Sequence, residues 1–211
     1  MNKYIVVIGD IIESKDLKPA LRKQTQNQLE DVFDQLNRES GELLSPYTIT
    51  LGDEFQAVYR SADQLFHDIW AFTAEIHPVR VRVTISLGEI TTEINREQSL
   101  GMDGPAFHTA RNRIDEMKIN DILLSLTTED KSFDRLVNSS LQILAGNLRT
   151  WNKNRFSILK KRYENLEVKK IARDLDLSEV AVYKNINAGT LDAVKDFTDC
   201  ISQKVNEMVN P

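Results

Sequence analysis

Residues 48–59 read Thr-Ile-Thr-Leu-Gly-Asp-Glu-Phe-Gln-Ala-Val-Tyr, two strand-like runs that meet at Gly52-Asp53. Glycine beside an acid, between β-branched and aromatic residues, predicts a tight hairpin because glycine tolerates the positive φ of such turns. An earlier apolar run, residues 4–9, predicts a buried central strand and ends in Asp10. If this strand lies beside the hairpin, Asp10 and Asp53 face one cleft. Carboxylates at strand ends, followed by backbone N–H groups, suit a hard divalent cation and a phosphate.

The composition indicates a soluble globular protein of one large domain or two small ones. The chain has 211 residues, 41% of them hydrophobic, and a net charge of −5. Its start lacks the cleavage site of a signal peptide and no apolar run reaches membrane length, so we expect a cytoplasmic protein that does not enter a membrane. The single Cys200 excludes an internal disulfide and a cysteine metal cluster.

Charge is distributed unevenly along the chain. Residues 146–190 contain ten Lys and Arg against five Asp and Glu, whereas the rest of the chain contains 17 against 27. An acidic body with one basic segment indicates nucleic-acid binding at that segment. A solvated helical face is the alternative explanation for so modest an excess.

Hydrophobic periodicity predicts the order strand, helix, strand, strand, helix, strand from the N-terminus. We expect a helix over about 18–39, a second helix opened by a capping box at 61–64, and a half-buried strand over 79–87 whose second face is polar. This order is that of ferredoxin-like βαββαβ domains, so an α/β (α+β) fold is predicted, with the first strand and the first hairpin strand at its centre.

A further helix and a short strand, over about 104–117 and 121–125, complete the expected first domain, residues 1–127. Residues 128–150 are predicted to form a helical connector, and residues 151–211 an all-α domain. Both boundaries are drawn from changes in periodicity and composition alone.

The all-α domain has the layout of a helix-turn-helix. Two apolar-periodic helices flank a short turn in which Ser178 is placed as an N-cap, and the helix from about 179 to 187 would enter the major groove of DNA. The residues predicted to contact DNA are Lys169, Lys170, Arg173, Ser178, Lys184, Asn185 and Asn187. The alternative is an all-helical module for dimerisation or packing.

Three segments together resemble the SatD family. They are 9–15 (Gly-Asp-Ile-Ile-Glu-Ser-Lys), 50–56 (Thr-Leu-Gly-Asp-Glu-Phe-Gln) and 101–111 (Gly-Met-Asp-Gly-Pro-Ala-Phe-His-Thr-Ala-Arg). The resemblance covers nearly the whole chain, helix-turn-helix included. The first domain also resembles the catalytic domain of class III nucleotidyl cyclases, a ferredoxin-like palm with one metal-binding aspartate after the first strand and another at the hairpin.

The cyclase resemblance implies a metal and nucleotide site. By it, Asp10 and Asp53 hold Mg²⁺ or Mn²⁺, and the main-chain carbonyl of Ile11 is a further ligand. The turn that would cradle a triphosphate consists of Ile11, Ile12, Glu13, Ser14 and Lys15. The residues themselves leave a second explanation open, because aspartates are common in turns and Lys15 can pair with Glu13 instead of a phosphate. Glu54 is expected on the opposite face from Asp53, in a salt bridge or in solvent.

Cyclases also place an Asn and, four residues later, an Arg after the fourth strand to stabilise the reacting phosphate. Here those places hold His108 and Asn112, and Arg111 or Arg113 is the candidate substitute, since a transferring phosphoryl group needs positive charge. His108 and Arg111 are therefore the candidate catalytic residues. They share one helix face, and His108 is a general base, a phosphate donor or a plain surface group.

Three functions are compatible with these patterns. The preferred hypothesis is a transcriptional regulator in which a nucleotide- and metal-binding sensor domain is fused to a DNA-binding helix-turn-helix. The alternatives are a metal-dependent nucleotidyl cyclase or nucleotidyltransferase-like enzyme with an accessory C-terminal module, and a protein-interaction scaffold. The expected partners are DNA, a nucleoside triphosphate or related nucleotide, and, by analogy, a second copy of the chain in a homodimer.

Overall fold

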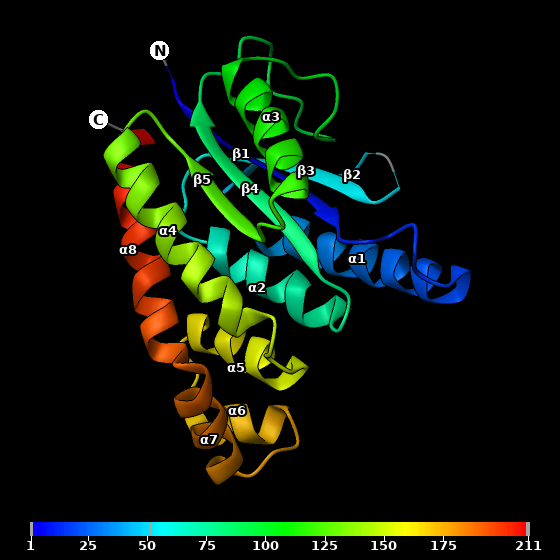
Figure 1. Ribbon diagram of the computed structural model, residues 1–211, viewed down its shortest axis with the longest axis vertical. Helices are drawn as coiled ribbons and strands as arrows, with labels where there is room; N and C mark the ends of the chain where they lie inside the picture. The colour runs from blue at the N-terminus through cyan, green and yellow to red at the C-terminus, as the bar shows by residue number, and fades with distance from the viewer. Residues whose placement is uncertain (1, 51, 210–211) are drawn as a thin grey trace.

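The computed structural model describes residues 2–50 and 52–209. A five-stranded sheet has helices on both faces, and a group of C-terminal helices lies below it (Figure 1). The predicted α/β class is confirmed. In chain order the elements are β1 (Tyr4–Ile11), α1 (Pro19–Glu39), β2 (Leu43–Ile49), β3 (Glu54–Tyr59), α2 (Leu65–Ile76), β4 (Val81–Gly88), α3 (Pro105–Ile119), β5 (Leu124–Thr127), α4 (Lys131–Leu148), α5 (Lys153–Tyr163), α6 (Val168–Asp174), α7 (Glu179–Gly189) and α8 (Leu191–Val209).

The strands lie in the order β2-β3-β1-β4-β5. Neighbours are antiparallel except β4 and β5, which are parallel. The prediction that the first hairpin strand lies centrally is wrong, because β3 pairs with β1 and β2 lies at the edge. Pro46 in β2 has no N–H to donate, and the β2–β3 register is irregular, so β2 suits an edge. The register places Asp10 opposite Glu54 and Arg82.

Two apolar layers enclose the sheet. On one face α1 and α2 bury an aromatic cluster that includes Phe33, Tyr47, Phe55 and Phe72. On the other face α3 covers Val6, Ile8 and Val58 of the central strands through Ala106, Phe107 and Ala110. The site described below lies on this second face, at the C-terminal end of β1.

Burial of β4 differs from the sequence prediction. Its polar face, Arg82, Thr84 and Ser86, is buried rather than exposed to solvent. The alternation of residues correctly predicted which side chains share a face, but α3 covers that face. Arg82 therefore lies inside the protein and requires a buried partner.

The predicted capping box at the start of the second helix is also wrong. α2 begins at Leu65, and the hydroxyl of Ser61 is bonded to the carboxylates of Glu42 and Asp63 at 2.8 and 3.1 Å. No side-chain cap is present at the N-cap residue, Gln64. The long-range contact with Glu42 thus uses the hydroxyl that the local pattern assigned to the helix.

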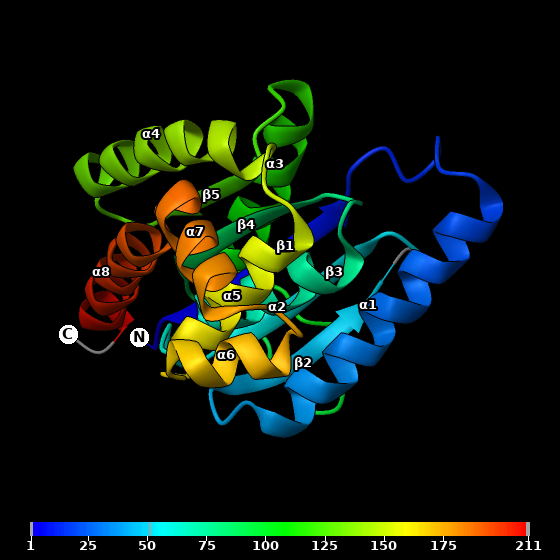
Figure 2. The same ribbon diagram turned by 90° about the horizontal axis from the view of Figure 1, so that it is seen from below.

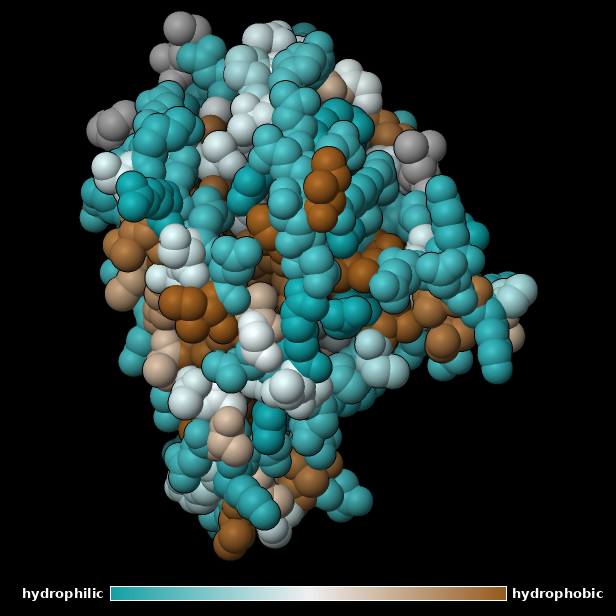
Figure 3. Space-filling view, viewed as in Figure 1, coloured by the Kyte–Doolittle hydropathy of each residue, from teal (hydrophilic) through white to brown (hydrophobic). Residues whose placement is uncertain are grey.

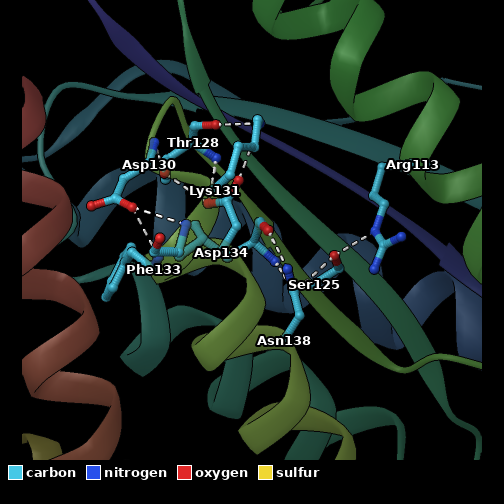
Figure 4. A network of polar contacts seen from close by, with 10 residues as sticks. Arg113, Ser125, Thr128, Asp130, Lys131, Phe133, Asp134 and Asn138 are labelled. Carbon is cyan, nitrogen blue, oxygen red and sulfur yellow. Dashed lines mark hydrogen bonds and ion pairs between the residues drawn. The ribbon is translucent and has the colours of Figure 1, made fainter.

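The segment predicted as a connector contains α4, which packs along β5. Asp130 caps α4 by accepting from the N–H groups of Ser132 and Phe133. Asn138 satisfies the outer edge of β5, because its amide accepts from the N–H of Leu126 at 2.9 Å and donates to the same residue's carbonyl at 2.7 Å (Figure 4). A side chain here replaces the missing neighbouring strand.

The C-terminal helices pack on the sheet part through α2 and α5, where Trp70 stacks on Phe156 at a centroid distance of 6.5 Å. Figure 2 shows α5, α6 and α7 grouped beneath the sheet, with α8 beside them. The predicted N-cap is confirmed, since the hydroxyl of Ser178 accepts from the N–H of Ala181 at 3.1 Å. None of the helices within residues 2–50 and 52–209 has the length and apolar character needed to cross a membrane.

Candidate functional site

The two aspartates singled out in the sequence line one cleft of about 390 Å³ at the end of β1. Asp10 is the penultimate residue of β1, and Asp53 lies in the hairpin connection directly before β3. Each follows a glycine that the backbone requires: a Cβ on Gly9 would overlap the ring of Phe55, and Gly52 has a φ of +73°. The lining residues are Asp10, Ile11, Glu13, Ser14, Lys15, Asp16, Asp53, Glu54, Arg82 and Lys118.

The turn after β1 folds over the hairpin tip. The N–H of Ile11 donates to the carbonyl of Asp53 at 2.9 Å, and the hydroxyl of Ser14 donates to Oδ2 of the same residue. Glu13 has a φ of +56°, an unfavourable conformation for a residue with a side chain. This tight turn leaves Lys15 exposed at the cleft, without an ion pair among the described residues. Residues 11–15, the turn predicted to bind a triphosphate, are thus hydrogen-bonded to Asp53, one of the two predicted metal ligands.

Asp10 is the most enclosed carboxylate of the cleft. Nη1 of Arg82 donates to both of its oxygens, each at 3.1 Å, and the two side chains are 10% and 7% exposed. Nζ of Lys118 lies 3.8 Å from Oδ2. Burial raises the pKa of the Asp10 carboxyl, and the positive charges of Arg82 and Lys118 only partly offset it. A divalent cation or a bound cationic side chain favours the ionised form.

The donor set fits Mg²⁺ or Mn²⁺ that is held jointly with a phosphate ligand. Within residues 2–50 and 52–209, no group of three or more His, Cys, Asp or Glu side chains is placed to hold a metal ion. Mg²⁺, however, commonly takes one or two carboxylates and completes its shell with water and substrate phosphates. Each Asp10 oxygen that accepts from Arg82 retains a second lone pair, so Asp10 and Asp53 together with the Ile11 carbonyl would serve as ligands.

The candidate catalytic residues His108 and Arg111 lie on α3 but outside the cleft. His108 is exposed and pairs with Asp103 at 3.0 Å, whereas Arg111 donates to Gln56 of β3 at 3.3 Å. Lys118, which does reach the cleft, is ten residues beyond His108, or about 15 Å along the helix axis. Within one chain, the candidate acid–base group and the two aspartates therefore do not meet.

The sequence patterns do not indicate the two cations that contact Asp10. The alternation of β4 predicts only that Arg82 lies on the polar face of a half-buried strand, and no motif marks Lys118. Strand order was the missing information, because the β1–β4 register sets Arg82 directly opposite Asp10. Glu54 was expected on the opposite face from Asp53, but it lines the same cleft; the expected salt bridge is present, since its carboxylate accepts from Lys118 at 3.0 Å.

A second candidate site is the outer surface of α6 and α7. We call it the α6–α7 surface and define it by Lys169, Lys170, Arg173, Val180, Tyr183, Lys184 and Asn187, all of which are exposed. Val180 and Tyr183 are 77% and 54% exposed although the inner residues Val182 and Ile186 are buried. At the bottom of Figure 3 this region is largely hydrophilic, with a hydrophobic group at its tip.

The remaining residues predicted to contact DNA differ in their exposure and in the hydrogen bonds they already make within the fold. Ser178 is exposed and is used as the N-cap of α7. Asn185 is half-buried, and its amide donates to the carbonyl of Ala181 at 2.8 Å on the same helix. Asn187 shares a helix face with Val180 and Lys184, because residues three, four and seven apart on a helix are neighbours. Of the two predicted base-reading amides, Asn187 is thus the one that faces solvent.

The fold and the cleft define a mixed α/β protein with an acidic cleft at the end of its central strand. Residues 4–195 match the model of the SatD family, and the chain belongs to this family, as its motifs predicted. No curated protein sequence matches the chain. A solved structure, a bacterial light-regulated adenylyl cyclase, is similar, with 17% identity and a TM-score of 0.45. The match covers 60% of this chain and 43% of that one, so the chain spans less than half the length of the cyclase.

Proposed function

We propose that the chain is a cytoplasmic, DNA-binding transcriptional regulator whose cleft binds a nucleotide with a metal ion. The proposal comprises a ferredoxin-like, cyclase-type domain over residues 1–127, a connector over 128–150 and a helix-turn-helix domain over 151–211. The antiparallel order β2-β3-β1-β4, with α1 and α2 on one face, supports the ferredoxin-like assignment. A homodimer is part of the proposal, because helix-turn-helix proteins often read paired half-sites.

The observation that carries DNA binding is the unpaired positive charge of the α6–α7 surface. Among the described residues, Lys169, Lys170 and Lys184 make no ion pair, and Nε of Arg173 is 4.0 Å from Asp174. Lysines that stabilise nothing within the fold are free to contact phosphates. Val180, Tyr183 and Asn187, exposed on α7, have apolar and amide groups of the kind that read base edges.

A gel shift tests this function. The probe is the genomic fragment upstream of the gene that encodes the chain, compared with an unrelated fragment of the same length. We expect preferential binding to the upstream fragment and a steep loss of affinity between about 50 and 200 mM salt, because phosphate contacts release counterions. Absent or salt-insensitive binding contradicts the proposal.

The cleft supplies the sensor part of the proposal. Asp10 and Asp53 hold the cation, Ser14 orients Asp53, and Lys15 contacts the phosphates. The bound cation supplies positive charge that screens the phosphate oxygens. Because no group of three or more metal-ligating side chains converges among the described residues, we expect Mn²⁺ alone to bind weakly and Mn²⁺ with a triphosphate to bind together.

The convergence of Asp10 and Asp53 on one cleft also favours a second candidate, metal-dependent nucleotidyl transfer. The position of His108, outside the cleft of its own chain, makes this candidate secondary. Incubation with Mn²⁺ and each of the four nucleoside triphosphates, followed by a search for cyclised or coupled product, distinguishes the two. Turnover with any of them favours the enzyme, and no turnover favours the regulator.

A further inference from the structure

Lys118 is placed among three carboxylates at the mouth of the cleft. Its Nζ lies 3.0 Å from Oε1 of Glu54, 3.8 Å from Oδ2 of Asp10 and 3.8 Å from Oδ1 of Asp115. Burial alone disfavours the ammonium, but the hydrogen bond to Glu54 and the charge of Asp10 outweigh it, so the pKa of Lys118 is raised. The side chain therefore carries a full positive charge at neutral pH.

The two cations that contact Asp10 differ in freedom of movement. The side chain of Arg82 is 7% exposed and is fixed by bonds to both Asp10 oxygens and by Nε, which donates to the carbonyl of Ile122 at 3.2 Å. The side chain of Lys118 is 37% exposed and comes from the last turn of α3. A lysine is a compact charge on a flexible stem, so Lys118 can move its ammonium while the guanidinium cannot.

Charge in the cleft is nearly balanced before any ligand enters. Five carboxylates and three cationic side chains line it, which leaves two negative charges in excess. In the cleft without a nucleotide, one divalent cation neutralises that excess. The position between the carboxylates of Asp10 and Glu54, which could otherwise hold a further cation, is occupied by the ammonium of Lys118.

We propose that the ammonium of Lys118 takes the place of a second divalent cation, so that the cleft binds one Mg²⁺ or Mn²⁺ per chain together with its nucleotide. This inference rests on the proposed metal and nucleotide site. When the nucleotide binds, the ammonium keeps its bond to Glu54 and exchanges Asp10 for a phosphate oxygen. Lys118 is a positioning residue for the phosphates, and it supplies charge that two-metal sites obtain from their second ion.

The test counts bound Mn²⁺ by electron paramagnetic resonance in the presence of a nonhydrolysable ATP or GTP analogue. For the wild type we expect one Mn²⁺ per chain. For Lys118→Met we expect a second Mn²⁺, and an affinity for the analogue that is about ten-fold lower at low Mn²⁺, the loss of one charge-assisted contact, and recovers as Mn²⁺ is raised. Lys23→Met, an exposed change on α1 outside the cleft, is the matched control and should behave as the wild type.

Two Mn²⁺ ions in the wild type overturn the inference, as does a Lys118→Met variant that matches Lys23→Met. Weaker analogue binding without a second Mn²⁺ overturns it as well. These results leave the metal and nucleotide site itself standing. If the wild type binds no Mn²⁺ with either analogue, the proposed sensor function fails instead. Thermal unfolding without ligand checks that each variant is folded.

Discussion

The cleft and the α6–α7 surface are both rich in charge, but they use it differently. In the cleft, Asp10 is held by Arg82 at 3.1 Å, and Glu54 by Lys118 at 3.0 Å. On the α6–α7 surface the lysines point into solvent and, within the part of the chain that the structure describes, make no ion pair. Charges of the first kind are paired inside the fold without a ligand, whereas charges of the second kind are left to solvent.

This difference teaches how to separate folding from binding by mutation. A buried ion pair is costly to break, because the remaining charge is left without a partner. An exposed lysine contributes little to stability, and its loss is felt only in the complex. Variants in the cleft should therefore change stability and ligand binding together, and variants on the α6–α7 surface should change DNA binding alone.

The largest expected effect is that of Arg82→Met. The change leaves Asp10 buried without its guanidinium, so the free energy of unfolding should fall by about 3–5 kcal/mol. Urea denaturation measures it, with exposed Arg96→Met as the control that should lie within about 0.5 kcal/mol of the wild type. The double variant Asp10→Asn with Arg82→Met should lose less unfolding free energy than Arg82→Met alone, because neither charge is left buried without its partner. If Arg82→Met is as stable as the control Arg96→Met, the Asp10–Arg82 pair contributes nothing to the fold.

Charge reversal on the α6–α7 surface is expected to have the second-largest effect, on DNA affinity. Replacing Lys169, Lys170 and Lys184 by Glu should lower DNA affinity by about a hundred-fold or more at low salt and flatten its salt dependence, because three phosphate contacts are lost. The melting temperature should stay unchanged. Lys18, Lys23 and Arg38 of the α1 region, replaced by Glu together, are the matched control. DNA binding that falls equally in both triple variants would assign the effect to net charge rather than to this surface.

Much of the fold could be predicted from local sequence, but the features that depend on contacts between distant segments could not. α1, α7 and the Ser178 cap follow from periodicity and capping, which depend on neighbouring residues only. The positions of β2, the start of α2 and the burial of β4 depend on contacts between distant segments. The hydroxyl of Ser61, for example, looks like a helix cap until Glu42 is seen beside it at 2.8 Å.

The same distinction applies to the cleft. Gly9-Asp10 and Gly52-Asp53 marked two strand ends, and the structure brings both aspartates to one cleft. Arg82 and Lys118 could not be found in this way, because 72 residues separate Arg82 from Asp10 and 64 separate Lys118 from Glu54. Only the strand order and the direction of α3 bring these side chains together.

The smallest effect is expected away from both regions, where α5 contacts α8. The hydroxyl of Tyr163 on α5 is bonded to Thr198 on α8, and burial raises its pKa to about 12. The folded state thus favours the neutral phenol, a contribution to stability that is complete below pH 10 and is lost as the pH rises to about 12. At pH 7 the free energy of unfolding of Tyr163→Phe should be lower than that of the wild type by about 1 kcal/mol or less. As the pH rises from 10 to 12, the variant should lose less stability than the wild type. Thermal unfolding across this range measures the difference, and parallel curves would contradict it.

The two regions are expected to be coupled, so that occupancy of the cleft changes DNA binding. The most direct measurement is DNA affinity by fluorescence anisotropy, with and without Mn²⁺ and a nonhydrolysable triphosphate, for the wild type and Asp53→Asn. We predict a change of about five-fold or more in the wild type, in the range typical of coupled sites, and none in Asp53→Asn. A wild-type affinity that the ligand leaves unchanged, or an equal change in Asp53→Asn, would contradict the claim.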